Sequence, residues 1–220
     1  MSAQWQVGKL YATAAYELHK AVNRSSDVAP GTPDAFGNII DPNSDVADED
    51  ARKFGIQYGF SKRTIFSALY EDMRRYVQPQ LVPFNERTRS GTWFALTQYL
   101  GGMDNVNFGW AHANPTPGDP GQHNTPGGAN PDNIANLYTV AFKHVVDPHL
   151  SWYANYAVTA NHAAAHYDLG AGGHGVTTDC HDATQLSAFD PTTGTVTGTG
   201  PHCFAGATLR GLSAGMQVRF

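Results

Sequence analysis

The sequence predicts an all-β fold in which antiparallel strands cross a membrane and form a barrel. Short, aromatic-rich runs carry apolar residues at every second position, which gives each strand one apolar and one polar face. Very short turns alternate with long polar loops between these runs. No stretch approaches the ~18 consecutive apolar residues that a membrane-spanning helix requires. Any crossing of a membrane is therefore expected to use strands of roughly ten residues.

Two-residue alternation is clearest in four runs of the chain: residues 10–21, 53–60, 106–110 and 150–158. In the first of them the even positions from Leu10 to Leu18 are apolar, whereas the odd positions include Glu17 and His19. The other three runs divide in the same way, with large apolar residues at one parity and mainly polar or small residues at the other. This division predicts strands whose two faces meet different surroundings.

Five further runs complete an expected set of about nine strands: residues 2–7, 64–76, 91–100, 136–146 and 208–220. In three of them, 64–76, 91–100 and 136–146, apolar residues occupy both parities over part of the length, so the sequence does not assign their faces. Helical periodicity is not sustained anywhere. The runs are therefore expected to form a single barrel domain over residues 1–220.

The connections between the runs alternate in length. Short turns are expected at residues 8–9, 61–63, 101–104 and 147–149, and long loops at residues 23–50, 77–87, 115–132 and 161–206. A compact soluble domain seldom tolerates several loops longer than ~12 to 15 residues. Outer-membrane barrels, in contrast, combine short periplasmic turns with long extracellular loops. We therefore expect the long loops on the extracellular side, with a soluble antiparallel sandwich as the alternative fold.

Composition excludes other classes of protein. Only 15% of the residues are charged, against roughly 25% in average proteins, and the formal net charge is −5. A nucleic-acid-binding protein needs a basic surface to neutralise phosphates, and the sequence has no basic stripe. It also lacks the GxSxG nucleophile motif of a lipase. No enzymatic activity, cofactor or metal is predicted, and no nucleic-acid partner.

Two motifs resemble those of a known family. The turn Phe60-Ser61-Lys62-Arg63-Thr64 is similar to a periplasmic turn common in general Gram-negative porins, especially those of beta-proteobacteria and neisseriae. The closing segment 211–220 resembles the last strand of these porins, whose terminal Phe, here Phe220, is recognised by the barrel-assembly machinery. The resemblance covers essentially the whole chain. It implies a water-filled channel for the passive diffusion of small hydrophilic solutes and ions.

The resemblance also implies the surroundings of the protein. They are the outer membrane of a Gram-negative bacterium, with its lipid and lipopolysaccharide, and a homotrimeric assembly. If Phe220 and the short turns are periplasmic, the first of about nine strands begins outside the cell, whereas single-chain barrels normally have an even strand number. No signal peptide is visible at the start. We therefore expect the C-terminal portion of a barrel of about 16 strands, whose constriction loop lies in the missing part.

The polar parity supplies the candidate lining of the channel: Glu17, His19, Lys53, Gln57, Asn107, Ser151, Asn155, Gln217 and Arg219. Rings of charge set ion preference in pores, so Glu17 and Lys53 are the expected selectivity positions. Aromatic residues near strand ends are expected to form the interfacial girdles of a barrel: Tyr11, Phe60, Trp93, Tyr99, Trp110, Tyr138 and Trp152.

Two loops carry groups that point to binding. Cys180 and Cys203 in loop 161–206 are predicted to form a disulfide, because paired cysteines in an exported loop are usually bridged. Nearby histidines leave a zinc site as the alternative. An adhesin or receptor barrel, with its binding surface in loop 161–206, is the alternative function. Acidic residues before residue 51 are interpreted as a solvated loop: Asp27, Asp34, Asp41, Asp45, Asp48, Glu49 and Asp50.

Overall fold

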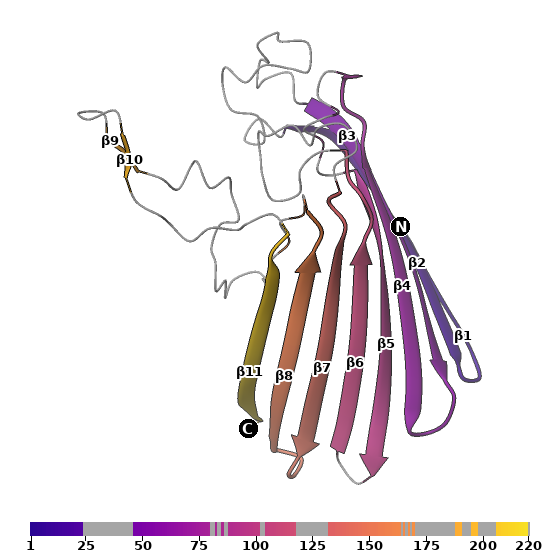
Figure 1. Ribbon diagram of the computed structural model, residues 1–220. Helices are drawn as coiled ribbons and strands as arrows, with labels where there is room; N and C mark the ends of the chain where they lie inside the picture. Colours follow the sequence, from indigo (N-terminus) through magenta and orange to yellow (C-terminus); the bar gives the residue numbers. More distant parts are fainter. Residues whose placement is uncertain are drawn as a thin grey trace.

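The main element of the fold is one antiparallel sheet. The computed structural model describes residues 1–23, 46–79, 82, 85, 88–101, 104–117, 132–163, 165, 167, 169, 188–190, 195–197 and 206–219. Within these ranges nine strands pair in the order β1-β2-β3-β4-β5-β6-β7-β8-β11, and all the pairs are antiparallel. Figure 1 shows them side by side as an open, curved wall. The all-β, antiparallel prediction is confirmed.

The strands of this sheet match the nine runs that the sequence predicts as strands. They are β1 (Ser2–Val7), β2 (Leu10–Asn23), β3 (Val46–Gly59), β4 (Thr64–Arg75), β5 (Arg89–Gly101), β6 (Asp104–Ala113), β7 (Ala135–Val145), β8 (Leu150–Asn161) and β11 (Thr208–Val218). A separate hairpin of β9 (Ala188–Asp190) and β10 (Thr195–Thr197) falls within loop 161–206, and the sequence pattern does not predict it. Among the described residues no helix is long and apolar enough to cross a membrane.

β3 begins earlier than the sequence pattern predicts. The predicted loop 23–50 extends too far, because the acidic residues at its end already pair with β2 and β4. Cations on the neighbouring strands neutralise them. Lys20 Nζ donates to Asp48 Oδ2 at 2.6 Å, and Arg75 Nη1 donates to Glu49 Oε1 at 2.6 Å. Cross-strand ion pairs of this kind stabilise a sheet, so an acidic run continues the strand instead of forming a solvated loop.

The short turns between described strands lie at the same end of the sheet, where β11 also ends (Figure 1). Gly8, in the turn between β1 and β2, has a φ of 56°, which glycine adopts without steric cost. Ser61 Oγ accepts hydrogen bonds from the backbone amides of Arg63 and Thr64, both at 3.0 Å. Asp147 accepts two such bonds in the turn between β7 and β8. These three turns are thus stabilised by their own sequences.

One face of the sheet carries a continuous apolar belt. Residues opposite each other in the ladder share a face, and the central row of the belt runs through all nine strands: Val7, Leu10, Tyr58, Phe66, Leu96, Phe108, Val140, Tyr156 and Leu212. Aromatic rings stack across strands, with centroid distances of 6.2 Å for Phe66–Phe94 and 5.5 Å for Phe94–Trp110.

The belt is not covered by a second layer of the described chain. Leu212 is 79% exposed, Phe108 48% and Val140 44%. The buried hydrophobic residues of the described ranges are three alanines, Ala47, Ala135 and Ala165. A soluble sandwich buries one face of each sheet against the other, so this arrangement does not fit the alternative fold. A single wall with an exposed apolar face is instead what a membrane-spanning barrel presents to lipid.

Several predicted features lie outside the described residues. These are the assembly signal Phe220, the cysteine pair Cys180 and Cys203, and the greater part of loop 161–206. The first four residues of the acidic set also belong there. The structure does not test the predictions made for these residues.

Candidate functional site

The face opposite the belt is polar. The ladder places on it the strand residues that alternation selects as a channel lining: Glu17, His19, Lys53, Gln57, Asn107, Ser151, Asn155 and Gln217. Arg219 follows β11 at the same parity, and its backbone amide donates to His149 O at 2.8 Å. Ser151 is only 7% exposed, so it contributes little to the surface. The other side chains form a polar surface that extends from β2 to β11.

Amides and hydroxyls bind one another across this polar face. Thr97 Oγ1 donates to Asn107 Oδ1 at 2.7 Å, and Asn107 Nδ2 donates to Asn105 Oδ1 at 2.8 Å. At the last strand pair, Asn155 Nδ2 donates to Ser213 Oγ at 3.3 Å. These bonds hold side chains on strands β5, β6, β8 and β11 against the wall. They satisfy polar groups while leaving further lone pairs and N–H groups for water.

Ion pairs neutralise much of the charge on the polar face: Lys53–Glu71 at 3.1 Å, Arg75–Glu49 at 2.6 Å and, when His19 is protonated, His19–Glu17 at 2.7 Å. Both expected selectivity positions, Glu17 and Lys53, therefore have partners. Within the described ranges, the side chains of Arg89 and Lys143 have no hydrogen bond or ion pair. The unpartnered charges on this face of the strands are thus basic.

Three asparagines close the bases of the long loops, and alternation gives no signal for them. Asn85 Nδ2 donates to Arg75 O at 3.1 Å, between β4 and β5. Asn161 Nδ2 donates to Ala207 O at 3.0 Å, between β8 and β11. Asn133, which is fully buried, accepts from Thr116 N and donates to Thr116 O, both at 2.9 Å. The only sequence feature that could have indicated these asparagine-to-backbone hydrogen bonds is the position of each asparagine near the end of a strand.

Replacing Asn133 by alanine is expected to lower the free energy of unfolding by about 1–3 kcal/mol, because the buried amide and carbonyl of Thr116 lose partners. The measurement is the midpoint of guanidinium unfolding of the protein in lipid vesicles. Asn114→Ala serves as the control, since Asn114 Nδ2 makes one part-buried bond, to Ser90 Oγ at 3.0 Å. Equal losses for the two variants would show that the buried hydrogen bonds between Asn133 and Thr116 contribute no more to stability than the part-buried bond of Asn114.

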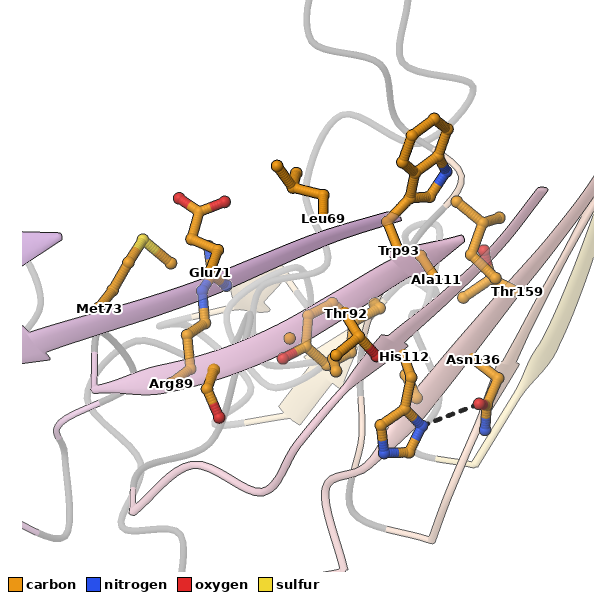
Figure 2. A pocket seen from close by; sticks show the side chains of 16 residues that line it. Leu69, Glu71, Met73, Arg89, Thr92, Trp93, Ala111, His112, Asn136 and Thr159 are labelled. Atoms are coloured by element: carbon orange, nitrogen blue, oxygen red, sulfur yellow. Dashed lines mark hydrogen bonds between the residues drawn. The ribbon is translucent and has the colours of Figure 1, made fainter. Parts of the chain in front are cut away.

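An apolar hollow of about 380 Å³ interrupts the polar face near the long loops. Its lining includes Leu69, Trp93 and Leu137, which belong to one row of the ladder. Tyr167, from the segment that follows β8, also lines it. Figure 2 shows Leu69, Glu71 and Trp93 on one side of the sheet, with His112 and Asn136 on the other. Because its large apolar side chains, Leu69, Trp93 and Leu137, lie on the polar face, the hollow opens on that face.

The predicted aromatic girdle is partly wrong. Trp110, Tyr138 and Trp152 lie on the belt face, as a girdle requires. Trp93 pairs with Leu69 and Ala111 on the polar face instead. Tyr11, opposite Gln57, and Tyr99, opposite Asn105, also lie there. Apolar residues at both parities of β5 concealed the orientation of Trp93, because only the register with neighbouring strands fixes which parity faces the belt.

Between the apolar belt and the long loops, the belt face of the sheet carries charged residues. Arg52 Nη2 donates to Asp50 Oδ2 at 3.2 Å, and Arg74 Nε donates to Asp72 at 3.0 Å. Tyr76 Oη also donates to Asp50 Oδ2, at 2.8 Å, and this hydrogen bond raises the pKa of Tyr76. The charged residues occupy two successive rows of the ladder, with Asp50 opposite Arg74 and Arg52 opposite Asp72. These paired charged rows mark the end of the apolar belt on β3 and β4.

Within the described ranges, no group of three or more His, Cys, Asp or Glu side chains is placed to hold a metal ion. The sequence-based zinc alternative concerns loop 161–206, where the cysteines lie outside these ranges. The polar face therefore offers hydrogen bonds, ion pairs and an apolar hollow, but no metal-binding cluster among the residues described.

Comparison with known proteins supports the fold. No protein-family model matches the chain, and no curated protein sequence matches it. Among solved structures it is similar to an anion-selective porin from Comamonas acidovorans, with a TM-score of 0.55 and 15% identity. The match covers 100% of this chain and 48% of that porin, so the chain spans about half of its length. The chain thus has the fold of part of a porin barrel. The resemblance to porins that the sequence indicates is confirmed for the fold.

Proposed function

We propose that this chain forms part of the wall of a water-filled channel in the outer membrane of a Gram-negative bacterium. Small hydrophilic solutes and ions would diffuse through it passively. The observation that supports this function is the separation of the two faces: an exposed apolar belt crosses all nine strands, and polar side chains cover the opposite face. Lipid would contact the apolar belt, and water would solvate the polar face.

The two edges of the sheet are part of the proposal. Unpaired backbone groups are costly in lipid, so β1 and β11 are expected to pair with further strands and close the wall. The long loops would lie outside the cell and the short turns in the periplasm. A closed barrel of about 16 strands has a water-filled lumen. Diffusion through such a lumen requires neither catalysis nor a cofactor.

The surroundings follow from the two faces and from the resemblance. The paired charged rows beyond the belt, which include Arg52, Asp72 and Arg74, would meet the headgroups of lipopolysaccharide, where charges are no longer in hydrocarbon. Recognition of Phe220 by the barrel-assembly machinery and a homotrimeric assembly rest on the resemblance to porins alone.

We further propose a preference for anions, like that named for the Comamonas porin. On the strands, the polar face has three carboxylates (Glu17, Glu49 and Glu71) against four bases (Lys53, Arg75, Arg89 and Lys143). Arg89 and Lys143, which have no partner among the described residues, would attract anions along the wall. Selectivity is therefore expected to depend on Arg89 and Lys143 more than on the paired positions Glu17 and Lys53.

The test is conductance of the native-length protein in a planar lipid bilayer. We expect stepwise, ohmic current and a zero-current potential in a KCl gradient that reports anion preference. Lys143→Gln should shift this potential toward cation preference. Arg210→Gln removes the same charge from the belt face and should leave the potential unchanged. Absence of current would contradict the channel and favour the adhesin alternative, and an equal shift in both variants would contradict the assignment of faces.

A further inference from the structure

We propose that the apolar hollow is a binding subsite for small solutes that combine one planar apolar ring with a carboxylate. This inference rests on the proposed function, since it places the hollow in the lumen of the channel. A polar lumen gives no reason for Leu69, Trp93 and Leu137 to gather in one row of the ladder. An apolar surface facing water is costly, so its presence in the lumen points to an apolar ligand.

The floor of the hollow consists of small residues. The next row of the ladder toward the long loops contains Gly91, Ala113 and Ala135, and all three line the hollow. Because these residues have at most a methyl group, they leave space above the sheet where larger side chains would fill it. Ala135 is itself covered, at 4% exposure, whereas Gly91 and Ala113 are half-buried. A flat ring could therefore lie on the wall at Gly91 and Ala113.

Trp93 forms one side of this space and remains available to a ligand. It is 40% exposed. The neighbouring residue toward the short turns is Gly109, where an added Cβ would clash with Thr139 Oγ1 but would lie at an ordinary contact distance, 3.6 Å, from Trp93 Nε1. The indole therefore lies against the backbone of β6 at Gly109. Stacking of a ligand ring against such an indole strengthens binding beyond the burial of its area.

The charge at the rim selects a carboxylate. Arg89, opposite Met73 in the ladder, lines the hollow. Its guanidinium has no hydrogen bond or ion pair within the described ranges, and a guanidinium can bind a carboxylate through two parallel hydrogen bonds. Glu71 also lines the hollow, but its carboxylate is paired with Lys53 Nζ at 3.1 Å. The net charge offered to a ligand is therefore positive.

The size of the hollow limits the ligand. Pockets that bind drug-sized molecules have volumes of about 300–1,000 Å³, and this hollow, at about 380 Å³, lies at the small end. It is open toward the lumen, so a bound solute can leave again. A single-ring carboxylate is therefore expected to bind weakly and reversibly, which is compatible with passage through a channel.

The test uses benzoate as the probe and acetate as the reference. Saturation-transfer NMR on the detergent-solubilised, native-length protein measures benzoate binding without requiring conductance. We expect benzoate to bind at least about tenfold more tightly than acetate, which corresponds to about 1.4 kcal/mol. Trp93→Ala should abolish this difference. Ala113→Leu, which fills the floor and keeps Trp93, should do the same, so a folding defect of one variant does not leave the test undecided.

Controls separate the subsite from general effects. Tyr153→Ala removes an aromatic side chain from the same polar face, near Gly215 and away from the hollow, and should leave benzoate affinity unchanged. Arg89→Gln should make benzoate bind no more tightly than benzyl alcohol. Equal binding of benzoate and acetate to the unaltered protein would overturn the subsite, and so would unchanged benzoate affinity in both Trp93→Ala and Ala113→Leu. Conductance without benzoate binding overturns only the subsite, whereas benzoate binding without conductance overturns the channel.

Discussion

Val140→Arg is expected to lower the free energy of unfolding in lipid vesicles by about 2–4 kcal/mol, the cost of an arginine near the middle of the bilayer on the lipid face of a barrel. Val140 is the β7 residue of the central belt row, between Phe108 and Tyr156. At 44% exposure it has no second layer among the described residues to receive the charge. The measurement is the midpoint of guanidinium unfolding, followed by tryptophan fluorescence.

The adjacent residue supplies the matched control. Ala141 lies on the polar face of the same strand, opposite Asn107 and Asn155. Ala141→Arg adds the same side chain to a surface that is proposed to meet water, so its cost should stay below about 1 kcal/mol. Equal costs for Val140→Arg and Ala141→Arg would show that the two faces of β7 do not meet lipid and water as proposed.

Arg75→Ala is the second variant for which we expect a large loss, about 3 kcal/mol, because it leaves a carboxylate in a protected site without its partner. The Arg75 side chain is only 3% exposed and that of Glu49 14%. Arg75 Nη1 donates to Glu49 at 2.6 Å, and Nη2 donates to Val22 O at 3.3 Å. The residue therefore joins β4 to the end of β2 as well as to β3.

Arg74 is the control for this variant. It pairs with Asp72 at 3.0 Å, but its side chain is 50% exposed, on the belt face. Exposed ion pairs contribute about 0.2–1 kcal/mol, so Arg74→Ala should have a small effect on the same unfolding midpoint. If the two alanine variants lose similar stability, the buried hydrogen bonds of Arg75 do not hold together the ends of β2, β3 and β4 that join the long loops.

Much of the fold could be predicted from local pattern. Short apolar runs identified all nine strands of the sheet. In the runs that alternate clearly, the pattern also put Glu17, Lys53 and Asn155 at the polar parity, because the side-chain period of a strand is two wherever it occurs. The turn at Ser61 was equally local, since its hydroxyl binds amides two and three residues further on. Such features need no knowledge of the neighbouring strands.

Other features depend on contacts between residues far apart in the sequence. The sequence did not indicate that residues 46–50 belong to β3, because the cations that neutralise them, Lys20 and Arg75, lie on other strands. Nor did it indicate the loop-base hydrogen bonds of Asn133, whose partner Thr116 lies at the far end of a long loop. Pairing partners are set by the register of the whole sheet.

The amino-acid sequence by itself determined that this protein is a set of two-faced antiparallel strands joined by alternating short and long connections, since hydrophobic period and turn chemistry act over a few residues. Only the tertiary structure decided which faces align. It turned Trp93 toward the polar side, paired Lys53 with Glu71 and left Arg89 without a partner in the described chain. The physical reason is that a one-residue shift in register moves every side chain of a strand to the opposite face.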